Sequence, residues 1–353
     1  MRVLLTGVPG WLGSRFLEIL NEGSDDTAVP EELRKYFTGT EVSCLVLPNQ
    51  DISFLERLER KSIHIYRGDL REGKSLFDFL KEAEGSVLVH LAGIIHPRAH
   101  IRELFELNVR GSETLIQSAL RRNIKKIIVI SSNSPVGCNP DRTHLFTEES
   151  AYHPYMAYGR SKMELENMVR QYTSRYDADI TILRPCWFYG PNQPDRQTRY
   201  FTMVREGKAP LVGDGGNRRS MSYVDNTCQA ILRAIVNPAS RGQTYWVADE
   251  RPYPMIEIID TIRIVLHEDF DIPVKNSYLR LPSFTSDCAC LVDGLIQKFG
   301  LYNQKIHVLS EMNKNIACSI DKAVRELGYH PTVSLREGMS RSVSWCLAQG
   351  RTI

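Results

Sequence analysis

The sequence predicts an α/β protein with a doubly wound parallel sheet and a smaller C-terminal lobe. Short continuous runs of Val, Ile and Leu recur along most of the first 250 residues, and amphipathic stretches separate them. Continuous apolar runs are typical of strands that are buried on both faces, as in a parallel sheet. Strands that alternate with helices favour the doubly wound arrangement. A glycine-rich turn directly after the first run also fits this fold.

Seven apolar runs are the expected strands, and the amphipathic stretches between them are the expected helices. The strands are expected at Arg2–Thr6, Val42–Leu47, Ser62–Tyr66, Val87–His90, Lys126–Ser131, Ile180–Arg184 and Thr244–Ala248. Helices are expected at Trp11–Leu20, Leu104–Arg122 and Tyr155–Tyr176, where apolar residues recur along one face. Residues 21–40 form a polar insertion before the second strand, with room for a short helix.

The regular alternation lapses after Cys186, where Gly and Pro become frequent. We therefore expect residues 1–185 plus 224–250 to form the domain that contains the sheet. Residues 186–223 plus 251–353 are expected to form the smaller, substrate-binding lobe.

The composition is that of a globular protein without a strongly charged partner. The chain has 353 residues, of which 42% are hydrophobic, and a formal net charge of +2. This charge does not predict a nucleic-acid partner, and no run of about 18 apolar residues predicts a membrane span. The N-terminus lacks a signal-peptide pattern, and the eight cysteines are dispersed without a C-x-x-C pair. These features favour a cytoplasmic protein with reduced thiols and no bound metal.

The turn after the first strand carries the first functional signal. It runs Thr6-Gly7-Val8-Pro9-Gly10-Trp11-Leu12-Gly13 and opens a helix. Glycines let the backbone approach a pyrophosphate, and the helix N-terminus offers N–H groups and partial positive charge. A dinucleotide-binding turn is therefore expected; the alternative is a tight strand–helix turn without a ligand.

Tyr158 and Lys162 form a Y-x-x-x-K motif inside the third expected helix. The i, i+4 spacing places both side chains on one face, where they can address one ligand. An alcohol gives up hydride only as its hydroxyl proton is removed, and a free phenol, with a pKa of about 10, is a poor base. A neighbouring ammonium and an oxidised nicotinamide ring are expected to lower the pKa of Tyr158. The pair predicts hydride transfer at an alcohol carbon.

Together these motifs resemble the extended short-chain dehydrogenase/reductase family, of the NAD-dependent epimerase/dehydratase type. The T-G-x-x-G-x-x-G spacing is typical of this family, and three later pieces follow in the family's order. They are Gly68-Asp69-Leu70, His90-Leu91-Ala92-Gly93 and Asn108-Val109-Arg110-Gly111. The resemblance implies a Rossmann-type sheet and an NAD(P)-binding function for the domain at 1–185 plus 224–250.

The resemblance also assigns residues to the cofactor. It implies that Asp69 lies against the adenine and that Lys162 holds the nicotinamide ribose. The cofactor-binding residues expected on this basis are Gly7, Gly10, Trp11, Leu12, Gly13, Asp69, Leu70, Leu91, Ala92, Gly93, Asn108, Tyr158, Lys162 and Pro185.

A serine motif at the end of the fifth strand adds a third catalytic residue. In the family, a Ser or Thr at this point hydrogen-bonds the reacting oxygen. Counting back from Gly137 implies Ser132, with Ser131 and Ser134 as alternatives. The expected catalytic residues are Ser132, Tyr158 and Lys162.

Motifs in the second half of the chain resemble those of nucleotide-sugar epimerases, dehydratases and reductases. They are Arg184–Pro191, Gly213–Asn226 and the closing Ile320–Pro331, with an insertion at 265–312. In many such members the Arg that matches Arg219 pairs with the substrate diphosphate, a role that suits a forked cation. Trp187 replaces an Asn that these members often place against the nucleotide. The expected substrate-binding residues are Ser132, Trp187 and Arg219.

Several activities stay open. Ser132-Asn133-Ser134 lacks the two carboxylates of the sugar 4,6-dehydratases, so 4,6-dehydration is not expected. A nucleotide-sugar epimerase or related oxidoreductase is preferred over a 3β-hydroxysteroid dehydrogenase-like enzyme or a carbonyl reductase. The aromatic residues around Trp187 suit an apolar substrate or the core equally. A non-catalytic dinucleotide sensor is a further alternative, although such proteins usually lose the Tyr or the Lys.

The cofactor and the assembly are also predicted. The sequence slightly favours NAD over NADP, because Leu47 stands where NADP-binding relatives often carry Arg. The resemblance implies a homodimer formed through the helices at 104–122 and 155–176. A small-molecule substrate is the other expected partner.

Overall fold

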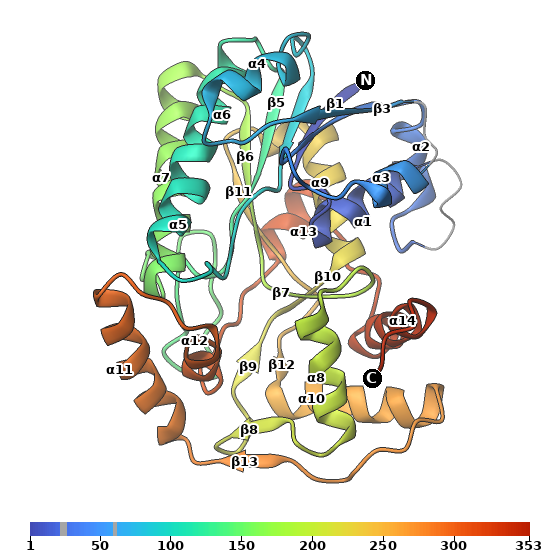
Figure 1. Ribbon diagram of the computed structural model, residues 1–353, viewed down its shortest axis with the longest axis vertical. Coiled ribbons are helices and arrows are strands. Elements are labelled where there is room, and N and C mark those ends of the chain that lie inside the picture. Colours follow the sequence, from blue (N-terminus) through green and yellow to red (C-terminus); the bar gives the residue numbers. More distant parts are fainter. Residues whose placement is uncertain (22–26, 59–61) are drawn as a thin grey trace.

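A seven-stranded parallel sheet lies at the centre of the computed structural model, which describes residues 1–21, 27–58 and 62–353 (Figure 1). The strand order is β11-β6-β5-β4-β1-β2-β3, and every neighbouring pair is parallel. The chain reverses its direction of winding between β4 and β1. Ligands of such sheets bind outside the carboxyl ends of the strands at this switch point. The predicted doubly wound α/β fold is confirmed.

The seven strands agree with the predicted ones to within one residue at each end. They are β1 (Arg2–Thr6), β2 (Glu41–Val46), β3 (Ile63–Arg67), β4 (Val87–His90), β5 (Lys126–Ile130), β6 (Ile180–Pro185) and β11 (Thr244–Val247). All residues of β4, β5, β6 and β11 are buried. Burial on both faces is the reason why unbroken apolar runs located these strands.

Helices cover both faces of the sheet, and alternate residues of β1 enter two separate apolar clusters. Leu4 belongs to one cluster, and Val3 and Leu5 belong to the other. On the Leu4 face lie α4 (Leu76–Phe79), α6 (Ser112–Leu120) and α7 (Met156–Tyr176), and on the opposite face lie α1 (Trp11–Leu20), α9 (Val224–Val236) and α13 (Asp321–Leu327). The helices expected at 11–20 and 155–176 are confirmed.

The polar insertion at 21–40 contains a short helix, as predicted. This helix is α2 (Glu31–Tyr36), and its Leu33 packs in the same cluster as α1. Residues 22–26 of the insertion lie outside the described residues. Another short helix, α3 (Ser53–Arg57), follows β2.

The helix expected at 104–122 is not regular along its length. It divides into α5 (Arg102–Phe105), a π-helical segment η2 (Glu106–Gly111) and α6. The wide segment turns the Asn108 side chain inward, where its amide bonds both backbone groups of Ile94 at 2.9 Å. Such π segments frequently mark functional sites.

The smaller lobe lies beyond the carboxyl ends of the strands, in the lower half of Figure 1. Its elements are β7 (Trp187–Tyr189), α8 (Asp195–Arg205), β8 (Pro210–Val212), β9 (Arg218–Arg219), β10 (Met221–Tyr223), β12 (Tyr253–Pro254), α10 (Met255–Ile264), η4 (Val265–Asp269), β13 (Leu279–Leu281) and α14 (Leu335–Ala348). All of these elements except β9 and β13 contribute to a third apolar cluster, which lies apart from the two clusters of the sheet.

Two helices of the 265–312 insertion form a hairpin at one side of this lobe, below α5 and α7 (Figure 1). They are α11 (Phe284–Lys298) and α12 (Gln304–Glu311), and α11 also packs against α7. Within the described part of the chain, none of the helices has both the length and the apolar character that a membrane span requires.

Candidate active site

The glycine-rich turn connects β1 to α1 at the switch point. Gly7 has a φ of +90°, and a Cβ at this position would lie 2.7 Å from the backbone of Leu91 and Ala92. A Cβ on Gly13 would lie 2.5 Å from the carbonyl oxygen of Gly7. No described side chain caps the N-terminus of α1, so its first N–H groups are left for a ligand. The predicted turn therefore has the form that a pyrophosphate requires.

Trp11 connects this turn to the smaller lobe through side-chain contacts. Its indole Nε1 donates a hydrogen bond of 2.6 Å to the carbonyl oxygen of Pro191, and its ring lies 5.9 Å from that of Phe188. The next residue, Leu12, is buried in the core. The two motifs that meet here are 180 residues apart in the sequence.

Asp69, which the family resemblance places against the adenine, forms an ion pair within the chain. Asp69 follows β3 as predicted, but its carboxylate pairs with Arg71, with Nη2 and Oδ2 at 2.5 Å. The hydrogen bond from Arg71 holds the pKa of Asp69 below its usual range. Leu70 packs in the core beneath it. The carboxylate of Asp69 thus already has one partner, Arg71. Contact of Asp69 with an adenine remains a prediction.

Arg67, which was not among the predicted site residues, stabilises the loop after β2. Its Nη1 donates to the carbonyl oxygens of Leu47, Pro48 and Gln50, at 3.2, 3.2 and 2.7 Å. This loop is where an NAD- or NADP-binding chain distinguishes the 2′ position of the ribose. Arg67, the last residue of β3, thus brings a cation to this loop, while Leu47 occupies the position where NADP-binding relatives often carry Arg.

The end of β4 carries Leu91, Ala92 and Gly93 across the switch point. The Ala92 N–H donates to Thr6 Oγ1 at 3.3 Å, and the same hydroxyl lies 2.7 Å from His90 Nδ1. Burial lowers the pKa of His90 to about 3, so this imidazole is a neutral structural group. These bonds hold the strand end close to the glycine turn.

Tyr158 is buried near the start of α7, and Ser132 is the serine beside it. Burial raises the pKa of Tyr158 to about 12, while a hydrogen bond with Ser132 acts in the opposite direction. The alternative Ser131 donates to the buried carboxylate of Glu166 at 2.6 Å instead. Ser134 Oγ lies 3.4 Å from Ser132 Oγ. Of the three candidates, Ser132 has the position that the predicted role requires.

Lys162 lies one helical turn after Tyr158. Its Nζ donates to the carbonyl oxygen of Ile130 at 3.0 Å, and a Cβ on Gly93 would lie 3.3 Å from it. Burial lowers the pKa of Lys162 to about 8, against the opposing charge of Glu166. An ammonium has three donors, and the bond to Ile130 uses one. The ammonium therefore has donors beyond the one that Ile130 takes, and it lies close to Gly93.

The expected lowering of the phenol pKa is not a property of the chain alone. Burial of Tyr158 outweighs the hydrogen bond with Ser132 and the positive charge of Arg196, which both lower its pKa, and the charge of Glu311 raises this pKa further. The phenol is therefore protonated at neutral pH, which is the state that delivers a proton to a carbonyl oxygen. Oxidation of an alcohol needs additional positive charge next to the phenol.

Arg219 and Trp187 form the substrate side of the site. The guanidinium lies over the indole ring, with Cζ 5.9 Å from the ring centroid. Arg219 is buried, and one of its amino groups donates to the carbonyl oxygen of Glu311. Its Nε has no hydrogen-bond partner, and no carboxylate among the described residues pairs with it. A buried cation without a counter-ion fits an anionic ligand.

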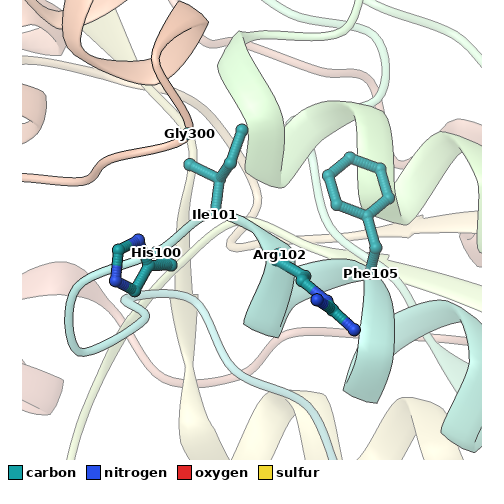
Figure 2. Close-up of a pocket in the computed structure, with 5 residues that line it drawn as sticks. All are labelled: His100, Ile101, Arg102, Phe105 and Gly300. Carbon is teal, nitrogen blue, oxygen red and sulfur yellow. The ribbon is translucent and has the colours of Figure 1, made fainter.

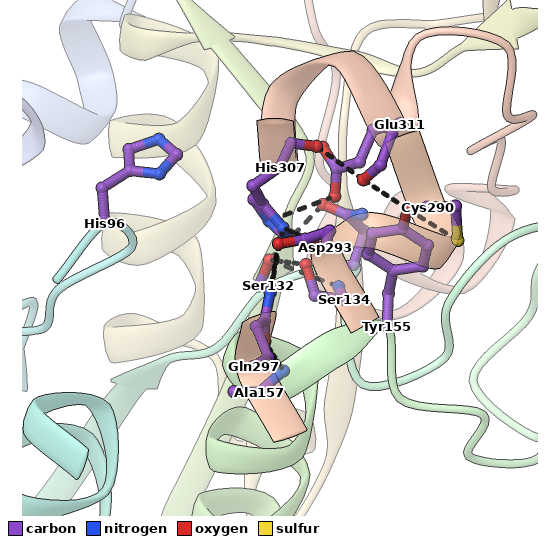
Figure 3. Close-up of polar contacts among 12 residues, drawn as sticks. His96, Ser132, Ser134, Tyr155, Ala157, Cys290, Asp293, Gln297, His307 and Glu311 are labelled. Carbon is purple, nitrogen blue, oxygen red and sulfur yellow. Dashed lines mark hydrogen bonds and ion pairs between the residues drawn. The ribbon is translucent and has the colours of Figure 1, made fainter. Parts of the chain in front are cut away.

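The α11–α12 hairpin closes the site with a buried polar network (Figure 3). His307 Nδ1 lies 2.7 Å from Asp293 Oδ2, and Gln297 donates to the other carboxylate oxygen at 2.9 Å. The Gln297 side chain also accepts a bond of 2.9 Å from the backbone N–H of Ala157. Burial alone would lower the pKa of His307, but the bond to Asp293 and the charge of Glu311 raise it. No family motif covers these residues, so no pattern in the sequence marked them.

Cys186 and Pro185 lie at the end of β6. Cys186 is buried with its Sγ 3.6 Å from that of Cys318, and this contact, with burial, raises the pKa of Cys186, so its thiol is a protonated packing group. Pro185 ends β6 beside Val247 of β11. Among the described residues, no group of three or more His, Cys, Asp or Glu side chains is placed to hold a metal ion.

Comparison with known proteins agrees with this geometry. The model of the NAD dependent epimerase/dehydratase family matches residues 3–248. An uncharacterized protein of Sinorhizobium fredii, y4nL, is 47% identical over 351 residues, which cover 99% of this chain and 96% of that protein. The decarboxylating sterol-4-alpha-carboxylate 3-dehydrogenase ERG26 of Candida albicans is 25% identical, with 97% of each chain covered.

The solved structures that resemble this chain include the dTDP-glucose 4,6-dehydratase of Streptomyces venezuelae with NAD bound. The TM-score is 0.72 at 24% identity, over 99% of this chain and 97% of that one. At this identity the likeness concerns the fold. The family model covers the strands, the glycine turn and the Tyr–Lys pair, and the chain therefore belongs to the NAD dependent epimerase/dehydratase family.

Proposed function

We propose that this protein is an NAD-dependent oxidoreductase or epimerase that transfers hydride at a secondary alcohol carbon of a nucleotide-sugar. One observation carries the proposal: Ser132 bonds Tyr158 and Lys162 lies one turn further along α7 with its Nζ close to Gly93, while the buried Arg219 bonds the carbonyl oxygen of Glu311 and has an unpartnered Nε. The first group suits a reacting alcohol, and the second suits a diphosphate.

The catalytic residues would divide the work as follows. When bound, the nicotinamide accepts or returns the hydride. Tyr158 takes the hydroxyl proton of the substrate or gives it back, and Ser132 holds the reacting oxygen. Lys162 holds the ribose and keeps a positive charge near the phenol. The buried Glu166 supports these residues in two ways. Its carboxylate accepts a hydrogen bond of 2.6 Å from Ser131, the residue before Ser132. Its negative charge raises the pKa of Lys162 and so favours the charged ammonium.

The dinucleotide fits the residues that are present. The uncapped first turn of α1 would take the pyrophosphate, and the unused donors of Lys162 would take the ribose. We retain NAD as the preferred cofactor, because no Arg follows β2 and the Nη1 of Arg67 already serves three carbonyl groups. A dissociation constant for NADP below that for NAD would contradict this preference.

A sugar 4,6-dehydration remains disfavoured, although the S. venezuelae enzyme is a dehydratase. The positions after Ser132 are Asn133 and Ser134, which cannot act as carboxylate acids. The second candidate is an apolar alcohol such as a 3β-hydroxysteroid, and the similarity to the Candida albicans sterol enzyme favours it. However, the hollow between Trp187, Tyr200 and Phe201 measures only about 10 Å³, so these rings pack against one another and leave no room for a steroid.

A sensor without catalysis is the least favoured alternative, because both Tyr158 and Lys162 are present and buried together. We further propose a cytoplasmic location and a homodimer, both by analogy with the family.

The test begins with the cofactor that co-purifies with the protein. UDP- and dTDP-hexoses are then titrated into the loaded enzyme, and Arg219→Ala is compared with Arg218→Ala as a matched control. Arg219→Ala should weaken nucleotide-sugar binding at least about tenfold, since a charge-assisted bond is lost. Arg218 bonds only carbonyl oxygens of Arg142 and Pro252 and should tolerate the change. Equal affinity in wild type and Arg219→Ala would remove the diphosphate assignment.

A further inference from the structure

Glu311, the last residue of α12, is linked to both halves of the proposed site. Its backbone carbonyl oxygen accepts a hydrogen bond from the guanidinium of Arg219, and its negative charge raises the pKa of Tyr158. Arg219 is only 8% exposed and has an unpartnered Nε, which indicates that a ligand binds beside Glu311. Among the residues that the structure describes, the only polar partner of the Glu311 carboxylate is His307. The Glu311 side chain is 27% exposed, so this carboxylate can exchange a proton with a ligand or with solvent.

His307 lies between Glu311 and a second, buried carboxylate (Figure 3). Its Nδ1 is 2.7 Å from Asp293 Oδ2, and its Nε2 is 3.8 Å from Glu311 Oε1. The bond to Asp293 fixes the orientation of the imidazole, with Nε2 on the side of Glu311. Burial opposes a charge on His307, but the bond to Asp293 and the charge of Glu311 raise its pKa. A charged imidazole favours the ionised form of Glu311, which is the form that a base requires.

The hairpin is attached to the turn that carries the phenol. Gln297 of α11 donates to Asp293 at 2.9 Å, and its side-chain oxygen accepts the N–H of Ala157, the residue before Tyr158, also at 2.9 Å. The carboxylate that orients His307 is therefore one hydrogen-bonded residue away from the start of α7.

The turn between α11 and α12 is attached to the loop between β4 and α5. The Ile101 N–H donates to the Gly300 carbonyl oxygen at 3.0 Å, and the Tyr302 N–H donates to that of Ala99 at 2.8 Å. His96 of the same loop bonds the Tyr302 hydroxyl. A hollow of about 600 Å³ lies at this junction (Figure 2), lined by His100, Ile101, Arg102, Phe105 and Gly300. The hairpin is thus held on two sides, which fixes α12 and Glu311 relative to the site.

We propose that Glu311 is a second acid–base group, which removes and returns a proton at the carbon next to the carbonyl group that hydride transfer creates. This inference rests on the proposed function, because it requires a ketone at the site. His307 and Asp293 are positioning residues, since they act through the Glu311 carboxylate.

The proton transfer balances without a further reactant. Loss of hydride converts the alcohol into a ketone, and the hydrogen on the neighbouring carbon becomes acidic. This C–H bond breaks, its proton passes to Glu311, and its electron pair forms an enolate. Tyr158, which has taken the hydroxyl proton, and Ser132 donate hydrogen bonds to the enolate oxygen. Return of a proton from Glu311 to the carbon restores the ketone, and return of the hydride restores the alcohol.

Other polar groups near the phenol are less suited to this role. Asn133 and Ser134 have no carboxylate. Glu166 is fully buried, and its carboxylate accepts a bond of 2.6 Å from Arg184. Glu311 is half-buried and accepts no such bond. One carboxylate carries one proton, so the proposal does not supply the pair of acids associated with sugar 4,6-dehydration.

Hydrogen exchange tests the proposal, with the NAD-loaded full-length protein and dTDP-4-keto-6-deoxyglucose as the probe. This probe is already a ketone, so its exchange requires no hydride transfer. In D₂O, wild type should place deuterium on a carbon next to the ketone faster than buffer alone does, as measured by mass spectrometry. Glu311→Gln keeps the shape of the side chain but cannot take up the proton, and it should slow exchange at least about 100-fold.

Asp287→Asn is the matched control, because it removes a 58% exposed carboxylate from the same hairpin. It should exchange at the wild-type rate. His307→Gln should slow exchange, although less than Glu311→Gln does. Reduction of the probe by NADH is measured in parallel, and both variants should slow it far less than they slow exchange.

Two outcomes overturn the proposal. One is an equal loss of exchange and reduction in Glu311→Gln, which would give the residue a general structural role. The other is a wild type that shows no exchange above that of buffer. The titration with UDP- and dTDP-hexoses then shows whether the proposed function fails as well, because that binding does not require Glu311 to transfer a proton.

Discussion

Gln297 accepts a hydrogen bond of 2.9 Å from the backbone N–H of Ala157, the residue directly before Tyr158. This N–H belongs to the first turn of α7, where helical donors have no partner within the helix. Gln297 comes from the inserted hairpin, 140 residues away in the sequence. The insertion thus holds the turn that carries the catalytic phenol.

We predict that Gln297→Ala slows turnover without loss of the dinucleotide. The Ala157 N–H would lose its acceptor and Asp293 a donor, so the phenol would shift relative to Ser132. Small misplacements of reacting groups cost about 10- to 100-fold in rate. Steady-state kinetics should show a lower kcat with an unchanged dissociation constant for NAD.

The control is Gln304→Ala, which removes an exposed amide from the same hairpin. It should match wild type in rate. If Gln297→Ala lowers the melting temperature and leaves kcat intact, the residue serves stability and not the position of Tyr158.

The sequence predicted the strands of the sheet better than it predicted the segments that pack around the candidate site. Buried strands such as β4 and β5 can be predicted from composition, because apolar residues on both faces produce a continuous apolar run. The π segment at Asn108 was not predicted, since it depends on bonds to Ile94 that no local pattern encodes. The bond from Ala157 to Gln297 likewise has no signal in either segment.

The proximity of the three proposed catalytic residues was predictable because they are close in the chain or at strand ends. Tyr158 and Lys162 are one turn apart on α7, and Ser132 follows β5 at the same edge of the sheet. The protonation state of the phenol was not predictable, because burial raises the pKa of Tyr158 more than the bond with Ser132 and the charge of Arg196 lower it. Burial depends on the hairpin and the lobe, which the motif does not specify.

Tyr158→Phe should remove turnover and preserve cofactor binding. The phenyl ring fills the same space, but it has no proton to exchange with the substrate oxygen. Loss of a general acid–base costs about 10²- to 10⁴-fold. Stopped-flow absorbance of the nicotinamide would record the rate, and fluorescence titration would record NAD affinity. A variant that turns over at the wild-type rate would exclude the Tyr158 mechanism.

The affinity for NAD should fall as the pH rises above about 8. The pKa of Lys162 is lowered to about 8 by burial, so the ammonium that is expected to hold the ribose loses its charge above this value. Lys162→Arg keeps a charge at every accessible pH. Titration of NAD binding against pH should show the alkaline loss in wild type and its absence in the Arg variant. The same loss in both proteins would assign the titration to another group.

Asp249 should make the protein less stable as the pH rises from about 4 to 7. Burial raises the pKa of this carboxyl to about 7, although it accepts bonds from the Tyr189 hydroxyl at 2.7 Å and from the Tyr223 N–H at 3.1 Å. Between the usual pKa of Asp and this value, the folded chain keeps the proton and the unfolded chain releases it. Folding then takes up a proton, so the free energy of unfolding falls with rising pH.

Asp249→Asn should remove that dependence, since the amide cannot ionise but can still accept from the Tyr223 N–H. Urea unfolding at about pH 5 and pH 7.5 should show a loss on the order of 1 kcal/mol or more in wild type and a smaller loss in the variant. The kinetic parameters at saturating substrate should change little, because Asp249 contacts residues of the smaller lobe and not the phenol. A wild-type free energy that is flat or rises over this pH range would show that Asp249 is ionised in the folded chain, held by its hydrogen bonds against the effect of burial.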